Sequence, residues 1–487
     1  MNTLDWSKLL NENRRKYRNN KEQETSNTKG NRTEIERDYD RILFASPTRR
    51  LADKTQVYPL DFHDSVRTRL THSHEVANLA RSIGMELAFT YPEKVFGKNH
   101  EALNVKRKIP SLLAAVGLVH DLGNPPFGHQ GEEAVKYWFN NKNVSLKKLK
   151  RTQDSIQEDV EVDDQVPFDF LNFDGNPQTF RLVTKLQIHK DEYGLNLTYA
   201  SLAALVKYPF TSSIKTNSPN GDRFYSKALG IFESEKDILE EVWEETGLSA
   251  GVRHPLAHVM EACDDIAYAV IDSEDTVKKG LASFSDVIDH LNEFEADPIV
   301  KEVIDFSVNE NSEFKKNNLS SAELNDVSMQ MFRVKAIYEL IKAVSETFVD
   351  KIDDIMNCTI PLNFELIKHS KGRVLVKALK DFGKRHGFDK EGVISLEVHG
   401  HNHILKTMDM LWEAIGHREN LKKEPFARYA WSTISENYRR VHKSNISTGK
   451  LASDYIDFQL LADSISGMTD SYLIRNHDKL KRLYEHK

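Results

Sequence analysis

Apolar residues recur every three or four positions along most of the chain, which is the spacing of a helix with one buried face. Residues 67–90, for example, place Leu70, Val76, Ile83 and Leu87 on one broad stripe. The same pattern predicts further helices from near Thr33 to Leu43 and over 110–122, 198–208, 235–246, 255–280, 322–349 and 402–416. The chain is therefore expected to be mainly helical.

Prolines and glycines predict where two of these helices begin and end. Pro110 suits the first turn of the helix over 110–122, because a helix start leaves that N–H unbonded in any case. The turn at 123–128 (GNPPFG) contains two prolines that forbid continuation, and a second helix is predicted to begin near His129. The segment 392–398 is predicted to hold a short strand. Together these features predict an all-α fold with peripheral helices and at most a short β element.

The distribution of charge suggests how the chain is organised. Residues 1–33 form a polar N-terminal segment, and residues 34–487 are expected to form a single large helical domain with its core at about 67–275. Runs of lysine and then of acidic residues mark about 141–170 as a surface insertion. The charged segment 296–325 is expected to be another exposed linker or loop. We find no internal repeat.

Composition narrows the class of protein further. The formal net charge of −7 disfavours a dedicated duplex nucleic-acid binder but does not exclude a small anionic ligand. Glycine and proline, 22 and 14 of 487 residues, fall below their usual combined share of about 12%, which fits a helical protein. Two cysteines cannot build a disulfide framework. Without a secretory signal or a long apolar stretch, the expected location is the cytoplasm, and no membrane partner is expected.

Three predicted helices place metal-type ligands among apolar residues. They carry His72, the pair His120-Asp121, and the pair formed by Asp264 and Asp265. A buried aspartate is costly unless it is paired or bound to a metal. His72, His120, Asp121 and Asp264 would make a site with two histidines, two aspartates and open positions for substrate and water. Such ligands suit Mn, Fe, Ni or Zn and are less typical of Mg.

Helical spacing places further polar residues on the same helix faces as these candidate ligands. Asp264, Tyr268 and Asp272 share one helix face at i, i+4 and i+8, which is a poor core pattern and a plausible site wall. Arg69 lies three residues before His72 and could reach a phosphate that the metal holds.

A histidine backed by a carboxylate follows the turn at 123–128. His129 and Glu132 are three residues apart, an arrangement suited to acid/base chemistry. The alternative is an ordinary helix start in which the dipole favours the glutamate.

Two other segments have competing interpretations. His399, His401 and His403 alternate, so on a strand they would share one side and could bind a metal, although a structural or base-pocket role is favoured. The basic stretch 371–385 is expected to be a solvated helix face, or otherwise to hold an effector nucleotide's phosphates or single-stranded DNA.

Motifs around these residues resemble a known family. His72, His120-Asp121 and Asp264 resemble the ligands of the HD-domain metal phosphohydrolases. The sequence around them is similar to that of bacterial deoxyguanosine triphosphate triphosphohydrolases. The similar motifs are RTRLTH at 67–72, HDLGNPPFGH at 120–129, RHPL at 253–256, DDIAY at 264–268 and SGMTD at 466–470. The resemblance runs from about residue 34 to 475.

The resemblance implies an all-α HD-domain fold, homo-oligomers that are often hexamers, and hydrolysis of dGTP to deoxyguanosine and triphosphate. It makes His72, His120, Asp121 and Asp264 the ligands of a divalent ion, Mn²⁺, Mg²⁺ or another transition metal. It assigns acid/base catalysis to His129, oriented by Glu132. Asp265 aligns beside the ligand rather than as one.

The resemblance also implies a set of substrate-binding residues, namely Gln56, Val57, Arg69, Asn176, Lys207, Tyr208, Tyr268, Asp272 and Glu397. Arg69 would bind the α-phosphate, and Asn176, Lys207 and Tyr208 would line the triphosphate and sugar side. Tyr268 would pack under the deoxyribose. Gln56 and Asp272 would hold the 3′-hydroxyl, Val57 would contact the sugar, and Glu397 would lie near the base.

Three functions remain open at this point. The first is a dGTP triphosphohydrolase, favoured because Asn124 matches the enterobacterial-type branch rather than the histidine of the vertebrate SAM-and-HD dNTPases. The second is a broader dNTP triphosphohydrolase that an effector dNTP activates. The third is a non-catalytic nucleotide sensor or single-stranded DNA binder.

Overall fold

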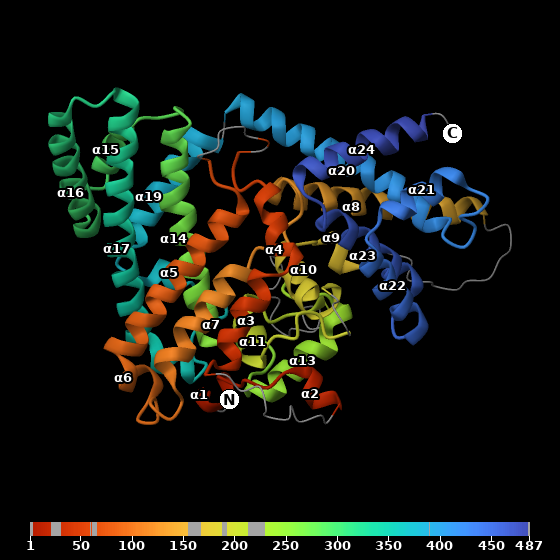
Figure 1. Ribbon diagram of the computed structural model, residues 1–487, viewed down its shortest axis with the longest axis horizontal. Helices are drawn as coiled ribbons and strands as arrows, with labels where there is room; N and C mark the ends of the chain where they lie inside the picture. The colour runs from red at the N-terminus through yellow and green to blue at the C-terminus, as the bar shows by residue number, and fades with distance from the viewer. Residues whose placement is uncertain are drawn as a thin grey trace.

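The computed structural model describes residues 3–20, 31–58, 60, 66–153, 167–187, 192–212, 229–388 and 390–485. In these ranges the chain is helical, and its β pairing is confined to isolated bridges between Arg14 and Thr198 and between Thr55 and Thr68. The prediction of an all-α fold is confirmed (Figure 1). No helix among the described residues is long and apolar enough to cross a membrane.

The helices of the first half have these bounds: α1 Trp6–Leu9, α2 Arg15–Asn20, α3 Glu34–Leu43, α4 Ser46–Arg50, α5 Arg69–Thr90, α6 Pro92–Phe96, α7 Val105–Val119, α8 Gly128–Gln153, α9 Phe168–Leu171, α10 Gly175–Arg181, α11 Tyr199–Leu205, α13 Lys236–Thr246 and α14 Pro255–Lys278. Those of the second half are α15 Phe284–Asn292, α16 Pro298–Phe314, α17 Ser321–Met356, α18 Leu366–His369, α19 Arg373–Gly383, α20 Glu391–Gly416, α21 Pro425–Thr433, α22 Glu436–Thr448, α23 Ser453–Ser466 and α24 Asp470–Tyr484. Short 3-10 turns lie at Leu51–Asp53, Glu233–Glu235 and Lys315–Asn317, and π-helical turns at Leu182–Leu186 and Lys384–Phe388.

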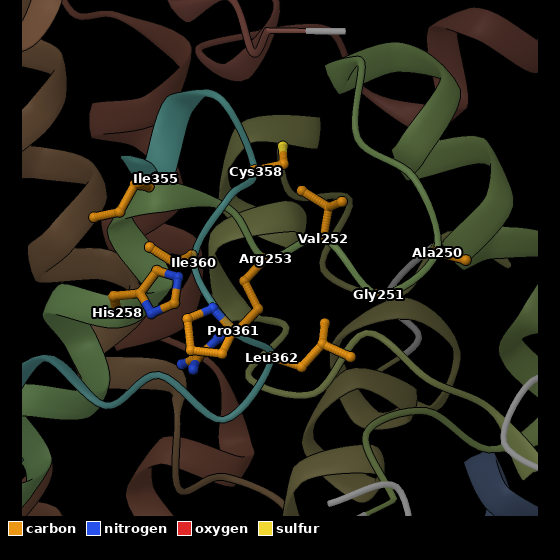
Figure 2. Close-up of a pocket in the computed structure, with 10 residues that line it drawn as sticks. All are labelled: Ala250, Gly251, Val252, Arg253, His258, Ile355, Cys358, Ile360, Pro361 and Leu362. Carbon is orange, nitrogen blue, oxygen red and sulfur yellow. The ribbon is translucent and has the colours of Figure 1, made fainter. Parts of the chain in front are cut away.

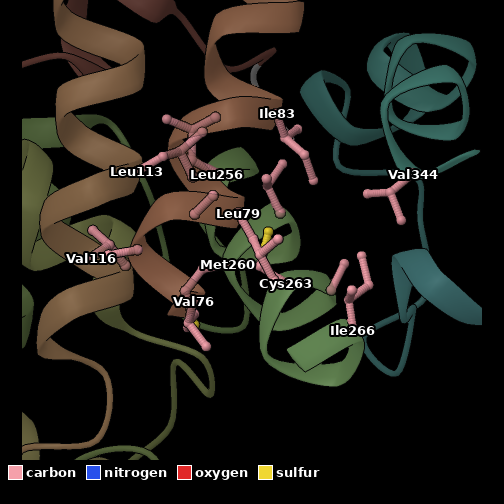
Figure 3. Close-up of a cluster of buried hydrophobic side chains, with 14 of the residues drawn as sticks. Val76, Leu79, Ile83, Leu113, Val116, Leu256, Met260, Cys263, Ile266 and Val344 are labelled. Atoms are coloured by element: carbon pink, nitrogen blue, oxygen red, sulfur yellow. The ribbon is translucent and has the colours of Figure 1, made fainter. Parts of the chain in front are cut away.

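A first hydrophobic core joins α5, α7, α14 and α17. Val76, Val116, Met260 and Val344 each come from a different one of these helices and meet in it (Figure 3). The thiol of Cys263 is buried in the same cluster and forms no disulfide. Because α14 is buried on almost every side, its polar residues stand out as candidates for function.

A second core lies under α8, α20, α23 and α24 and is rich in aromatic rings. Phe139 packs edge-on against Phe458, and Trp412 stacks on the same ring with the centroids 4.8 Å apart. In Figure 1 these helices gather on the opposite side of the molecule from α15, α16 and α17. The molecule therefore has two packed regions whose helices can supply opposite walls of one site.

Two segments differ from the secondary structure that the sequence predicted. The prediction of a short strand at 392–398 is wrong, because these residues form the first turns of α20. Consequently His399 and His403 share a helix face with their ring centroids 4.2 Å apart, while His401 faces Tyr137 instead. The linker or loop expected at 296–325 is also wrong, since most of it belongs to α16 and α17.

The difference at 296–325 has a simple physical reason. Asp297 caps the start of α16, and Val300, Val303 and Ile304 bury a narrow apolar stripe against α17. Charges on the exposed face of a helix do not prevent its formation.

Pro110 is also placed differently, inside α7 rather than in its first turn. The helix begins five residues earlier, at Val105, and the proline packs against Gly84 of α5. Its missing N–H leaves one helical hydrogen bond unmade.

The N-terminal segment contributes apolar anchors as well as polar residues. Trp6 and Leu9 of α1 are buried in the first core, and the Trp6 indole donates to the Val95 carbonyl at 2.8 Å. Arg14 is fully buried between Glu34 and Asp38. Residues 21–30 of the predicted polar N-terminal segment lie outside the described residues, as do residues 154–166 of the insertion predicted at about 141–170.

Candidate metal centre and the adjoining pocket

Three helices of the first core bring four predicted ligands together. His72 lies in the first turn of α5, His120 and Asp121 follow α7, and Asp264 lies in the middle of α14. Ligand atoms of His72, His120 and Asp121 all lie within 4.8 Å of one another. Asp264 Oδ1 is 3.2 Å from His72 Nε2 and 3.5 Å from His120 Nε2. The four side chains thus converge on one point.

The chemistry of these donors fits a cation. His120 donates from Nδ1 to the Gly117 carbonyl at 2.7 Å, so Nε2 carries the lone pair, and this buried atom makes no hydrogen bond among the described residues. Burial alone would lower the pKa of His120, but the carboxylates of Asp121 and Asp264 raise it to about 9. Neighbours that favour a proton at Nε2 would also favour a divalent ion there.

Arg69 lies directly beside this centre. Its guanidinium donates to Asp121 Oδ2 at 2.6 Å, and its Nε is buried without a hydrogen-bond partner among the described residues. Gly128 makes room for it, because a Cβ there would lie 2.3 Å from the Arg69 Nη2 atom. A buried guanidinium with an unused N–H is suited to an anionic ligand.

A cavity of about 360 Å³ opens onto the centre, within the range usual for small-molecule sites, about 300–1,000 Å³. Its lining includes predicted residues from both packed regions, namely Gln56, Val57, Arg69, His72, Asp121, His129, Asp264, Tyr268 and Glu397. Thr55, Phe127 and Gln130 line it as well. The structure therefore brings nine of the predicted residues to one pocket.

The turn at 123–128 shapes the wall of this pocket. Gly123 is required by close packing, because a Cβ there would lie 2.1 Å from the backbone nitrogen of Thr179 in α10. Phe127 has a left-handed backbone (φ 60°), which costs a bulky residue about 1–2 kcal/mol. Its N–H donates to Asp470 of α24 at 3.0 Å. This contact holds the turn open toward the pocket.

His129 and Glu132 form the expected pair at the start of α8. His129 Nδ1 lies 3.2 Å from Glu132 Oε2, and the other carboxylate oxygen accepts from the Gly175 N–H at 2.8 Å. The hydrogen bond to Glu132 raises the pKa of His129. The side chain of His129 is 76% exposed while that of Glu132 is mostly buried, so a fixed carboxylate orients an accessible imidazole.

Four predicted binding residues do not line the cavity. Lys207 lies 3.5 Å from Glu261 and over the ring of Tyr208, and Asn176 binds Asp174. Burial alone would lower the pKa of Lys207, but Tyr208, Glu261 and then Asp264 raise it. These residues border the site rather than face its open part.

Asp272, the fourth of them, is buried two turns beyond Asp264. Burial and the charge of Asp275 raise its pKa well above the usual range. Its Oδ2 atom and the Oε1 atom of Gln56 are both buried without a hydrogen-bond partner among the described residues. Unsatisfied buried oxygens are costly, so both atoms are suited to a polar group of a ligand.

Asp265 points away from the ligand cluster. Its carboxylate binds Lys380 of α19, whose ammonium also lies 5.5 Å from the centre of the Tyr268 ring. In the basic stretch at 371–385, Lys371 is likewise paired, with Glu346.

Sequence reasoning missed two residues that position the pocket. Lys54 is buried and donates to the carbonyls of Asn124 and Ser466, and burial lowers its pKa to about 7. Asp470 accepts from the Thr55 and Phe127 backbone N–H groups. Asp470 lies in the SGMTD motif at 466–470, but only tertiary contacts reveal what Lys54 and Asp470 hold.

A second cavity, of about 280 Å³, is lined by the segment 250–253 before α14, by His258 of α14 and by residues of the segment 355–362 (Figure 2). Arg253 and His258 reach into an otherwise mainly apolar lining that includes Ile355 and Leu362. Arg253 binds Glu261 at 2.6 Å, and Glu261 also lies 3.5 Å from Lys207.

Comparison with known proteins agrees with this geometry. A model of the HD domain matches residues 69–167, a range that includes His72, His120 and Asp121 but ends before Asp264. The fold, the match and the two-histidine, two-aspartate centre define the class, an HD-domain protein of the phosphohydrolase type.

Relatives define the family more narrowly. A deoxyguanosinetriphosphate triphosphohydrolase-like protein of Listeria monocytogenes is 34% identical over 495 residues, which cover 99% of this chain and 100% of that protein. One from Pseudomonas aeruginosa is 30% identical over 461 residues, 92% of this chain and 93% of that protein. The chain belongs to the deoxyguanosinetriphosphate triphosphohydrolase-like family of HD-domain proteins.

Proposed function

We propose that this protein hydrolyses dGTP to deoxyguanosine and intact inorganic triphosphate in a metal-dependent reaction. The observation that carries the proposal is the convergence of two histidines, two aspartates and a buried arginine at one end of a nucleotide-sized cavity. The names of the relatives support the same substrate. The protein would act in the cytoplasm as a homo-oligomer.

His72, His120, Asp121 and Asp264 would hold the divalent ion, Mn²⁺, Mg²⁺ or another transition metal. Such an ion polarises a phosphoryl oxygen and lowers the pKa of water. Arg69 would place its unused Nε–H against the α-phosphate, with Asp121 fixing the plane of its guanidinium. The protein thereby concentrates positive charge where charge develops on the α-phosphorus oxygens.

His129 would move the proton in the reaction. In its neutral form Nε2 can accept a proton from the attacking water, because Nδ1 is engaged with Glu132. Glu132 stabilises the resulting imidazolium, and Gly175 holds that carboxylate in place. Water attack at the α-phosphorus then forms the new P–O bond and breaks the bond to the 5′-oxygen, which takes up a proton, balancing the one that His129 accepts, and leaves as the 5′-hydroxyl of deoxyguanosine.

The remaining residues would select the nucleotide. Gln56 and Asp272, with their unsatisfied buried oxygens, would bind the 3′-hydroxyl. Tyr268 and Val57 would pack against the deoxyribose and leave no room for a 2′-hydroxyl. Glu397 would lie near the base, at the end of the pocket supplied by α20.

Three further residues would act at the triphosphate side. Lys207, paired with Glu261, would supply positive charge, and Tyr208 and Asn176 would border it.

One assay tests this function. Each dNTP is incubated alone and then in pairs with the protein and Mg²⁺ or Mn²⁺, and the products are resolved. Triphosphate release from dGTP alone is expected. Release only from mixtures would favour activation by an effector dNTP, and no release with any metal would contradict the proposal.

A further inference from the structure

A second group of metal-type side chains lies between α20 and α24, which run side by side (Figure 1). It comprises His403 from α20 with His477 and Asp478 from α24, and ligand atoms of all three lie within 4.8 Å of one another. The ring centroid of His399, one turn earlier on α20, lies 4.2 Å from that of His403, and the ring centroids of His403 and His477 are 4.3 Å apart. No residue of this group lines the pocket described above.

The hydrogen bonds of these rings leave nitrogen lone pairs available. His403 donates from Nδ1 to the His399 carbonyl at 2.7 Å, so its Nε2 is the basic nitrogen. Histidines that bind a metal through one ring nitrogen typically donate the N–H of the other nitrogen to a backbone carbonyl or a carboxylate.

His477 supplies an independent observation. Its side chain is only 6% exposed, and Nε2 is buried without a hydrogen-bond partner among the described residues. Its Nδ1 lies 3.1 Å from Asp478 Oδ1, so a half-exposed carboxylate adds negative charge at the edge of the group. An unsatisfied buried imidazole nitrogen is costly, and a bound ion would remove that cost.

We propose that His403, His477 and Asp478 bind a second divalent transition-metal ion, separate from the catalytic centre. Two imidazoles and one carboxylate, with open positions for water or His399, suit a borderline ion such as Zn²⁺, Co²⁺ or Ni²⁺ and are unsuited to Mg²⁺. The site would fasten α20 to α24.

Both helices also reach the nucleotide pocket. On α20, Glu397 lines it, and Gly400 packs so closely on Phe127 that a Cβ would lie 2.5 Å from the ring. On α24, Asp470 binds Thr55 and the Phe127 N–H. An ion joining the two helices would therefore stiffen the wall that carries Phe127.

Metal stoichiometry tests the proposal. Protein without a histidine tag is equilibrated with Co²⁺ or Zn²⁺, freed of unbound ion, and assayed for metal per chain. We expect two ions in the wild type, one in His403→Ala, and one in the His72→Ala/Asp264→Ala double variant. His401→Ala is the matched control, because that ring lies on the same helix but faces Tyr137, and it should retain two.

Further variants guard against loss of folding, which circular dichroism would reveal. Asp478→Asn changes a half-exposed residue without changing its shape and should weaken binding at this site about tenfold or more. Co²⁺ should also raise the melting temperature of the His72→Ala/Asp264→Ala protein, and His403→Ala should remove that rise. No ion in the His72→Ala/Asp264→Ala protein, or a wild-type ion count retained in both His403→Ala and Asp478→Asn, would overturn the proposal. Because the readout is bound metal, it is independent of the proposed dGTP hydrolysis.

Discussion

The two walls of the pocket differ in how their polar side chains are held. On the wall from α5, α7 and α14, Arg69, His72 and His120 are almost fully buried and packed on the first core. On the wall from α8 and α20, His129 is largely exposed and Glu397 is half-buried. The first wall holds Arg69 against Asp121 at 2.6 Å and His72 against Asp264 at 3.2 Å, whereas the second holds the His129–Glu132 pair at 3.2 Å with its imidazole open to solvent.

This difference suggests a division of labour. Charges that must bind a metal and a phosphate gain strength when they are fixed and shielded from water. A group that transfers protons must instead meet water and change its protonation state. The buried wall would therefore supply binding and electrostatic stabilisation, and the exposed wall would supply proton transfer and recognition of the base.

The largest expected effect comes from the buried wall. Replacing His72 by alanine should remove the bound catalytic metal and lower kcat by about 10³-fold or more, because a metal contributes several kcal/mol to the transition state. His74→Ala is the matched control, since that residue lies two positions along α5, is exposed and lines a different hollow. Metal content and kcat measured on both proteins check this. Equal losses in the two variants would mean that the helix, not the ligand, is affected.

The exposed wall should respond differently. His129→Gln should lower kcat by about 10²–10⁴-fold, the usual contribution of an acid/base group, while the catalytic metal stays bound. Steady-state kinetics together with metal analysis distinguish the two walls. A His129→Gln protein that lost its catalytic metal would show that the division of labour is wrong.

Substitution of Tyr268, which lines the pocket between the two walls, tests how the site would discriminate against ribonucleotides. Tyr268→Ala should raise kcat/KM for GTP relative to dGTP by about 10-fold, because it removes the ring that excludes a 2′-hydroxyl. Competition between the two nucleotides measures this ratio. Tyr338→Ala, an exposed tyrosine on α17, should leave the ratio unchanged. If Tyr268→Ala gained no ribonucleotide turnover, the steric explanation would be dropped.

The smallest effect concerns pH. The Glu132 carboxylate raises the pKa of His129 by stabilising its protonated form. Glu132→Gln should lower that pKa, so the neutral imidazole would appear at lower pH and the acidic limb of kcat/KM would move toward lower pH. Rates at saturating metal across pH 5–9 would show the shift. A limb that moved to higher pH, or stayed in place, would argue against His129 as the base.

The site was easier to predict than its surroundings. His72, His120, Asp121 and Asp264 could be found because charged residues in apolar helices require a reason. The first turns of α20, at 391–401, could not, since alternating histidines resemble a strand until packing on α24 and Phe127 shows that the helix predicted at 402–416 begins earlier. The roles of Lys54 and Asp470 depend on contacts between segments more than 300 residues apart, such as Phe127 and Asp470, which no local pattern contains.

The central claim is that water attacks the α-phosphorus in this pocket. It is tested by running the reaction with dGTP in H₂¹⁸O and locating the label by ³¹P NMR and mass spectrometry. We predict one ¹⁸O atom in the inorganic triphosphate, on an end phosphorus, and none in deoxyguanosine. Label in deoxyguanosine, or formation of dGMP with pyrophosphate, would contradict the account.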